Sequence, residues 1–189
     1  VHCSPCVADG AVMIAGCDGK VRTINLETGK QYAAATINGN IAASPAYGNG
    51  VVYVGTLTGQ YLAVRTRDGK VLWTIDAKKA DDTCYASAAL YGAAAIFAAQ
   101  SGKVFAVARD TGKPRWTFTA KSGVESSPVV AGDTIYFGST DGTLYALNVT
   151  TGRKTWQFSA GAELKASPAV AAGRLVIGSG DGAIYCFGR

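Results

Sequence analysis

The chain has 189 residues, of which 48% are hydrophobic and 16% are charged, so it contains enough apolar side chains to fold around a core. No run of about 18 apolar residues is present, which argues against direct insertion into a membrane. The net charge is +5, but lysine and arginine occur singly in predicted turns, which argues against nucleic acid as a partner. Glycine-rich turns among valine, isoleucine, tyrosine and phenylalanine indicate an all-β fold.

The clearest structural unit runs from Glu125 to Leu164. It begins with a Ser-Pro step, and its β-rich runs are separated by turns ending in Gly142 and Gly152. Short strands bounded by turn residues indicate a four-stranded antiparallel meander. The expected strands of this unit cover 128–131, 134–137 and 143–147, followed by a strand carrying Trp156.

Three markers of this unit recur along the chain: two at spacings of 40, 43, 40 and 40 residues, and the third, which occurs four times, at 40, 43 and 40. The serine of the first step lies at Ser4, Ser44, Ser87, Ser127 and Ser167. The first turn glycine lies at Gly19, Gly59, Gly102, Gly142 and Gly182, and the second at Gly29, Gly69, Gly112 and Gly152. A period of about 40 residues with four strands per unit is typical of β-propeller blades.

The sequence therefore predicts a single β-propeller array over residues 1–189. Its blades are expected at about 1–41, 42–83, 84–124, 125–164 and 165–189, with four complete and the fifth three-stranded. The first strand of each blade is small and apolar, which suits the innermost position. The third is continuously apolar, which indicates that neighbouring blades cover both of its faces. The polar linker Asp76–Thr83 holds the three extra residues of the longer spacing.

Three segments share the pattern Ala-x5-Gly-(Lys/Arg)-x2-Trp, which resembles the tryptophan-docking motif of the quinoprotein (PQQ-like) β-propeller repeat family. The matching residues are Ala63, Gly69 and Trp73; Ala106, Gly112 and Trp116; and Ala146, Gly152 and Trp156. The resemblance implies that the indole of one blade packs on the next blade, where an aromatic side chain buries about 150–250 Å². The first blade departs from the pattern, because Ala33 stands where tryptophan is expected.

The last predicted strand, formed by Ile184, Tyr185, Cys186 and Phe187, is expected to be an open edge. Because the family closes with seven or eight blades, three architectures remain open. The chain is the C-terminal part of a longer propeller, an open arc completed by another copy or a partner, or a small five-bladed ring. Unpaired edge strands favour pairing with another chain, and contacts between copies would close a ring or extend a filament.

The five cysteines give an odd number, so at least one thiol is free or paired outside the chain. Cys3 and Cys6 have the spacing of a CxxC motif, but a second such motif is absent and His2 is the sole histidine. Val7 stands where haem attachment requires histidine. We therefore interpret the cysteines as small apolar side chains of the β core. They are Cys3, Cys6, Cys17, Cys84 and Cys186.

The first functional hypothesis is a non-catalytic scaffold for protein interaction or self-assembly. The chain resembles BamB-type outer-membrane assembly propellers and related bacterial secreted PQQ-like proteins. That resemblance implies no cofactor, and a periplasmic or extracellular location after signal removal. Partner proteins, or other copies of the chain, would supply the missing strand of the fifth blade. A Ser/His/Asp catalytic set is not available, because the only histidine is His2.

The alternative is a fragment of a pyrroloquinoline-quinone-dependent dehydrogenase whose quinone and Ca²⁺ site lies largely outside the chain. That class implies an adjacent cysteine pair, which is absent, and several oxygen ligands for the cation. The turn aspartates are instead expected to cap their own turns, so we assign no catalytic or metal residue. These aspartates are Asp18, Asp68, Asp110, Asp133, Asp141 and Asp181.

Overall fold

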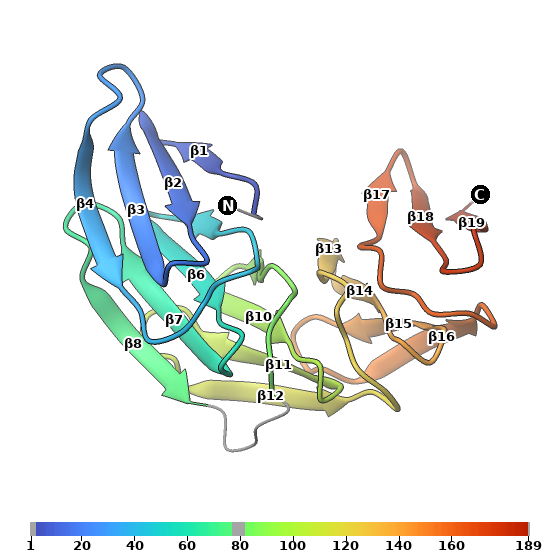
Figure 1. Ribbon diagram of the computed structural model, residues 1–189. Helices are drawn as coiled ribbons and strands as arrows, with labels where there is room; N and C mark the ends of the chain where they lie inside the picture. The colour runs from blue at the N-terminus through green and yellow to red at the C-terminus, as the bar shows by residue number, and fades with distance from the viewer. Residues whose placement is uncertain (1–2, 77–81, 189) are drawn as a thin grey trace.

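The computed structural model describes residues 3–76 and 82–188, which form nineteen strands in five antiparallel sheets (Figure 1). Four sheets have four strands and the last has three, so the predicted all-β blade architecture is confirmed. His2 and most of the predicted linker Asp76–Thr83 lie outside the described residues. Within the described ranges, no helix is long and apolar enough to span a membrane.

Each blade is a simple meander in which consecutive strands pair. Blade one contains β1 (Cys6–Ala8), β2 (Ala11–Ala15), β3 (Lys20–Asn25) and β4 (Gln31–Thr36). Blade two contains β5 (Ala46–Gly48), β6 (Val51–Gly55), β7 (Gln60–Arg65) and β8 (Val71–Asp76). Blade three contains β9 (Ala89–Tyr91), β10 (Ala94–Ala98), β11 (Lys103–Ala108) and β12 (Pro114–Thr119). Blade four contains β13 (Val129–Ala131), β14 (Thr134–Gly138), β15 (Thr143–Asn148) and β16 (Lys154–Ser159), and blade five contains β17 (Ala169–Ala171), β18 (Arg174–Gly178) and β19 (Ile184–Gly188).

The blades fan out in chain order as an arc (Figure 1). The short first strands of neighbouring blades contact one another, from β1 and β5 through to β13 and β17, so these strands form the inner side of the arc. The side chains of the third strands β7, β11 and β15 are almost all buried on both faces, as their continuous apolar character predicts.

The hydrophobic core lies between the blades, with one cluster of buried side chains at each of the four blade junctions. The cluster between blades two and three contains Phe97 and Phe105, whose rings are stacked, and Tyr61 meets both rings edge-on. Phe137 and Tyr145 stack in the same way between blades three and four. Because both faces of an internal blade contribute to such clusters, one blade depends on its neighbours for its core.

The hairpins that join first and second strands need residues in the left-handed region. Asp9 and Asn49 precede glycine there with φ of 49° and 54°, and Ala172 has the same role with φ of 49°. Asparagine and aspartate tolerate this conformation, whereas the Cβ of alanine makes it unfavourable. Ala172 is therefore a strained position in blade five.

Ala172→Asn should raise the free energy of unfolding by about 0.5–1 kcal/mol, because asparagine relieves the left-handed strain. The reciprocal change Asn49→Ala should lower stability by a similar amount. Urea unfolding followed by circular dichroism would measure both variants. An unchanged midpoint for both would contradict the assignment of strain to this hairpin position.

Candidate protein-binding surface

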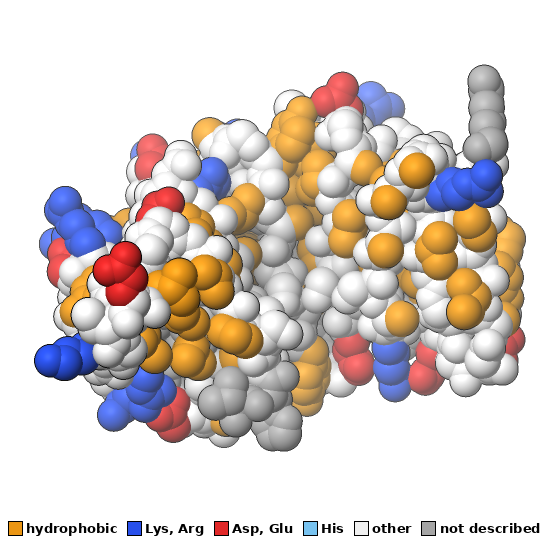
Figure 2. Space-filling view, turned by 90° about the horizontal axis from the view of Figure 1, so that it is seen from above, with side chains coloured by type: hydrophobic (Ala, Val, Ile, Leu, Met, Phe, Trp, Pro, Cys, Tyr) orange, Lys and Arg blue, Asp and Glu red, His pale blue; other side chains and the backbone are white. Residues whose placement is uncertain are grey.

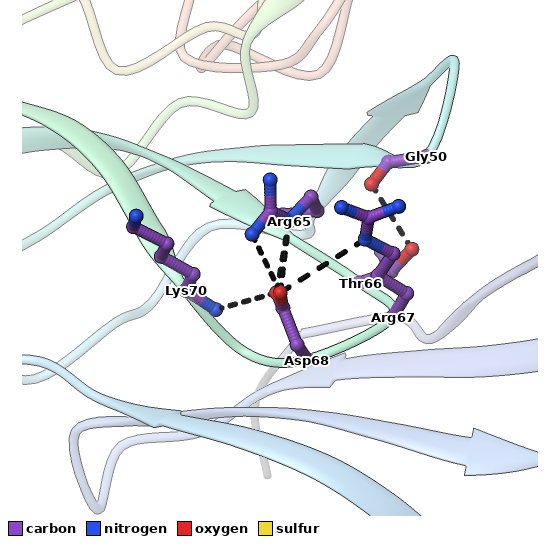
Figure 3. Close-up of polar contacts among 6 residues, drawn as sticks. All are labelled: Gly50, Arg65, Thr66, Arg67, Asp68 and Lys70. Carbon is purple, nitrogen blue, oxygen red and sulfur yellow. Dashed lines mark hydrogen bonds and ion pairs between the residues drawn. The ribbon is translucent and has the colours of Figure 1, made fainter.

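In blades two, three and four, the second turn presents a glycine to the blade before it. Gly69, Gly112 and Gly152 have φ of 70°, 69° and 69°, which glycine adopts without steric cost. In blade two the turn is fixed by Asp68, which accepts hydrogen bonds from Arg65 Nε at 3.0 Å and from the Lys70 backbone N–H at 3.1 Å (Figure 3). These two groups lower the pKa of the Asp68 carboxyl to about 2. Asp68 thus caps its own turn, as expected.

Two of the three predicted tryptophans lie directly against the turn glycine of the following blade. A Cβ placed on Gly112 would lie 2.9 Å from Cδ2 of Trp73, and one on Gly152 would lie 2.5 Å from Cε3 of Trp116. Trp73 Nε1 donates to the carbonyl of Arg109 at 2.8 Å, and Trp116 Nε1 donates to the carbonyl of Val149 at 2.9 Å. The structure therefore joins the motif residues pairwise between successive blades.

The alanine of each motif lies opposite its own tryptophan, since Ala63, Ala106 and Ala146 are the cross-strand partners of Trp73, Trp116 and Trp156. In blade one, Ala33 stands in place of an indole. At the junction of blades one and two, a Cβ on Gly69 would overlap the backbone of Ala34, because the turn of blade two packs directly against β4.

Trp156 of blade four is more exposed than its counterpart in blade two, with 41% of its surface accessible against 9% for Trp73. Its ring meets Phe187 edge-on, with the centroids 5.3 Å apart. Both rings border a pocket of about 440 Å³ that also contacts Thr155 and Arg174. An indole that is covered in the earlier blades is thus accessible here.

Strand β19 is the edge of the three-stranded sheet and contains the four predicted open-edge residues. Ile184 is 76% exposed, and Cys186 is exposed on the same face. Tyr185 and Phe187 are half-buried, belong to the cluster shared with blade four, and Tyr185 donates to the carbonyl of Ala160 at 2.9 Å. Only one face of this strand is therefore open. Seen from above, hydrophobic side chains lie on both sides of a central hollow, and those on the right lie over the C-terminal blades (Figure 2).

The repeated serines form a ladder of hydrogen bonds that sequence reasoning missed. The backbone N–H of Ser4 donates to Ser44 Oγ at 2.9 Å, and each serine donates in turn to the next blade's hydroxyl up to Ser167. Ser87 keeps its place in the ladder although Ala88 replaces the usual proline. Because Ser87 is kept where proline is lost, the sequence itself indicated that the serine hydroxyl has a role of its own, apart from the Ser-Pro turn.

The other turn aspartates do not all behave as predicted. Asp141 and Asp181 accept hydrogen bonds from backbone N–H groups of their own turns, as expected. Asp133 instead accepts a hydrogen bond from the hydroxyl of Tyr91 in the preceding blade, at 2.8 Å. Asp18 pairs with Arg22 at the start of the next strand. Each of these carboxylates thus has its own local partner, and only Asp133 reaches another blade.

The cysteines are divided between core and surface, and none forms a disulfide. Cys3 and Cys84 are buried, as predicted, and Cys6 and Cys17 are half-buried. The prediction is wrong for Cys186, because β19 has no neighbouring blade on that face. Burial raises the pKa of the Cys84 thiol to about 12.

The residues present do not fit a quinone and Ca²⁺ site. A quinone dehydrogenase resemblance implies adjacent cysteines, whereas no two of the five cysteines are adjacent in the sequence. Among the described residues, no group of three or more histidine, cysteine, aspartate or glutamate side chains could hold a metal ion. We therefore derive no chemical step through this cofactor.

The five repeated blades, with indole–glycine contacts between blades two and three and between blades three and four, define a propeller of the quinoprotein-type repeat class. The family model described as the outer membrane protein assembly factor BamB matches residues 2–119 and 86–188. The chain belongs to this family, and the resemblance inferred from the repeated motif is confirmed.

Two curated relatives are outer membrane protein assembly factors BamB. The protein of Burkholderia pseudomallei is 29% identical over 131 residues, covering 69% of this chain and 33% of the relative. The protein of Xanthomonas campestris is 34% identical over 79 residues, covering 36% of this chain and 20% of the relative. The chain thus matches at most about a third of the length of these relatives.

Two solved structures resemble the fold. BamB from Moraxella catarrhalis matches with a TM-score of 0.86 and 21% identity, covering 98% of this chain and 58% of that protein. Quinohemoprotein alcohol dehydrogenase from Comamonas testosteroni matches with a TM-score of 0.84 and 15% identity, covering 100% of this chain and 41% of that protein. At such identities the likeness concerns the fold alone, so the second structure does not favour the dehydrogenase alternative.

Trp73→Ala should lower the free energy of unfolding by about 3–5 kcal/mol, because it removes a buried ring that is packed between two blades. Trp156→Ala should cost about 1 kcal/mol, because its ring is already partly accessible to water. Guanidinium unfolding of both variants would measure the difference. Equal losses would contradict the inference that these two indoles occupy different environments.

Iodoacetamide at pH 8 should alkylate Cys186 first and Cys84 only when the protein unfolds, because the thiolate is the reactive form. Peptide mass mapping at successive times would give the order of modification. Alkylation of Cys84 at the rate of Cys186 in the folded protein would show that blades two and three separate easily.

Proposed function

We propose that this chain is a non-catalytic propeller scaffold that binds protein partners during outer membrane protein assembly, on the periplasmic side of that membrane. Membership of the BamB family supports this role. The observation that carries the proposal is the accessible docking position around Trp156, which presents an aromatic ring and an apolar pocket next to a strand edge.

We further propose that a partner protein or another copy of the chain supplies a turn and strand to this position. In blades three and four, a glycine turn covers the preceding blade's indole, and the outer strand completes the sheet. An incoming segment of the same kind would place glycine on Trp156 and pair its backbone with β19. Strand addition of this type combines main-chain hydrogen bonds with pockets for side chains.

A peptide of residues 149–159, which contains the turn and outer strand of blade four, should bind the protein saturably. Fluorescence anisotropy of the fluorescein-labelled peptide would measure this binding. A matched peptide carrying Gly152→Val should bind at least about tenfold more weakly, because a Cβ at this glycine overlaps the facing indole. Trp156→Ala in the protein should weaken the unmodified peptide similarly.

Light scattering over a range of protein concentrations would distinguish the two sources of the strand. A molar mass that rises with concentration, and falls when the peptide is added, would indicate that copies supply it. A constant monomer that binds the peptide would indicate a different partner. A monomer that binds neither the 149–159 peptide nor its Gly152→Val form, or that binds both equally, would contradict the strand-addition proposal.

A further inference from the structure

A groove of about 550 Å³ lies between blades two and three, far in the sequence from the open edge. Its apolar part includes Val51, Tyr53 and Leu72, and its polar part includes Arg109 and Arg115. Leu72 is 37% exposed within it. The volume falls within the range of about 300–1,000 Å³ that is typical of ligand-binding clefts. We call this feature the Arg109 groove.

The guanidinium of Arg109 is held in one orientation. Its central carbon lies 5.2 Å from the centroid of the Tyr53 ring, its Nε donates to Tyr53 Oη at 3.2 Å, and its Nη1 donates to the carbonyl of Gly92 at 3.1 Å. A planar guanidinium that is fixed before binding loses little side-chain freedom when it meets an anion. Arg109 is therefore preorganised for recognition.

Neither arginine of the groove is neutralised by a carboxylate in the described part of the chain. The ion pairs found there involve Arg22, Arg65, Arg67 and Lys165. Asp110 also borders the groove, but it forms no ion pair with Arg109 or Arg115. The groove thus keeps a positive charge next to an apolar surface.

A repeat-to-repeat comparison indicates that the chain makes room for this guanidinium. The positions equivalent to Arg109 in blades one, two and four are Leu26, Thr66 and Val149. The last residue of the first strand is Gly48 in blade two, whereas blades one, three, four and five have Ala8, Tyr91, Ala131 and Ala171.

Gly48 has no left-handed backbone that would require glycine. A Cβ at this position would instead overlap Nη2 of Arg109. The one glycine among the five equivalent positions therefore accompanies the one arginine among the four. This coupled departure from the repeat is the observation that singles out the groove.

We propose that the Arg109 groove binds an acidic side chain, aspartate or glutamate, within an extended segment of a partner protein. The carboxylate would pair with the guanidinium of Arg109, whose geometry suits a planar two-oxygen acceptor. Arg115 would add a second positive charge, and Leu72 with Val51 would contact a neighbouring apolar side chain. The inference rests on the proposed role in protein binding and specifies the chemistry of the partner.

The probe is the peptide acetyl-Ala-Leu-Glu-Leu-Ala-amide, titrated into the full chain by isothermal calorimetry at low salt. It should bind saturably, whereas the same peptide with glutamine in place of glutamate should bind at least about tenfold more weakly. Arg109→Gln and Arg115→Gln should each weaken the glutamate peptide. Arg115 is exposed, so the second variant tests the groove even if the first disturbs Tyr53.

The matched control is Arg153→Gln, which removes the same charge from an exposed turn of blade four and should leave affinity unchanged. Gly48→Ala keeps every charge but displaces the guanidinium, so it should also weaken binding. Equal binding of the two peptides, or full affinity in both groove variants, would overturn the proposal. Inorganic phosphate binding as tightly as the glutamate peptide would overturn the assignment to an acidic peptide.

This test separates the groove from the proposed function, because a synthetic peptide reports on Arg109 whether or not the 149–159 strand peptide binds at Trp156. Loss of glutamate-peptide binding with intact strand binding would remove the groove alone. Binding of the glutamate peptide without binding of the 149–159 peptide would support the groove proposal and contradict the strand-addition proposal.

Discussion

The contact on which this structure depends is the packing of an indole against a glycine turn of the next blade. A single blade is a thin meander that lacks a core of its own, and its buried side chains belong to clusters shared with its neighbours. At the outer side, the indole approaches the turn so closely that a Cβ on Gly152 would lie 2.5 Å from the ring of Trp116. At the inner side, the serine ladder joins the same blades through backbone N–H donors. Blades two, three and four are therefore joined at both the inner and the outer side of the arc, whereas the serine ladder joins all five blades.

The same constraint explains where we propose that partners bind. Surfaces between internal blades are filled by the repeat itself, so accessible apolar area is found where no turn covers an indole or where the repeat departs from its pattern. Trp156, which no turn of the described residues covers, and the open face of β19 provide one such surface. The Arg109 groove lies where the repeat departs from its pattern. Gly48 is smaller than the residues at its equivalent positions, and Arg109 is charged where the other blades have uncharged residues. A scaffold built from equivalent units can thus carry distinct binding sites without altering its core.

Much of the fold could be predicted because three sequence markers identify the repeating unit. The two turn glycines and the serine step fixed the number of blades, and the continuous apolar character of residues such as Leu144–Leu147 identified a strand buried on both faces. The docking residues were identified by resemblance to the family motif, which also implied that each indole packs on the next blade. That Trp73 lies beside Gly112 and Trp116 beside Gly152 required the structure. The serine hydroxyls were missed because a Ser-Pro step also suits an ordinary turn. Arg109 and Gly48 meet only once the register of β5 and the position of blade three are known. The exposure of Cys186 likewise depends on what lies beside β19, which a local pattern cannot show.

The most direct test of the central claim is hydrogen exchange at the indole N–H groups, followed by nuclear magnetic resonance in the native protein. The indoles of Trp73 and Trp116 donate to carbonyls of the following blade, so their protons should exchange only when blades separate or the protein unfolds. Their protection should therefore match that of the most protected backbone amides in β7 and β11. Exchange of either indole within minutes, while those amides stay protected, would show that the blades are not held together by this contact.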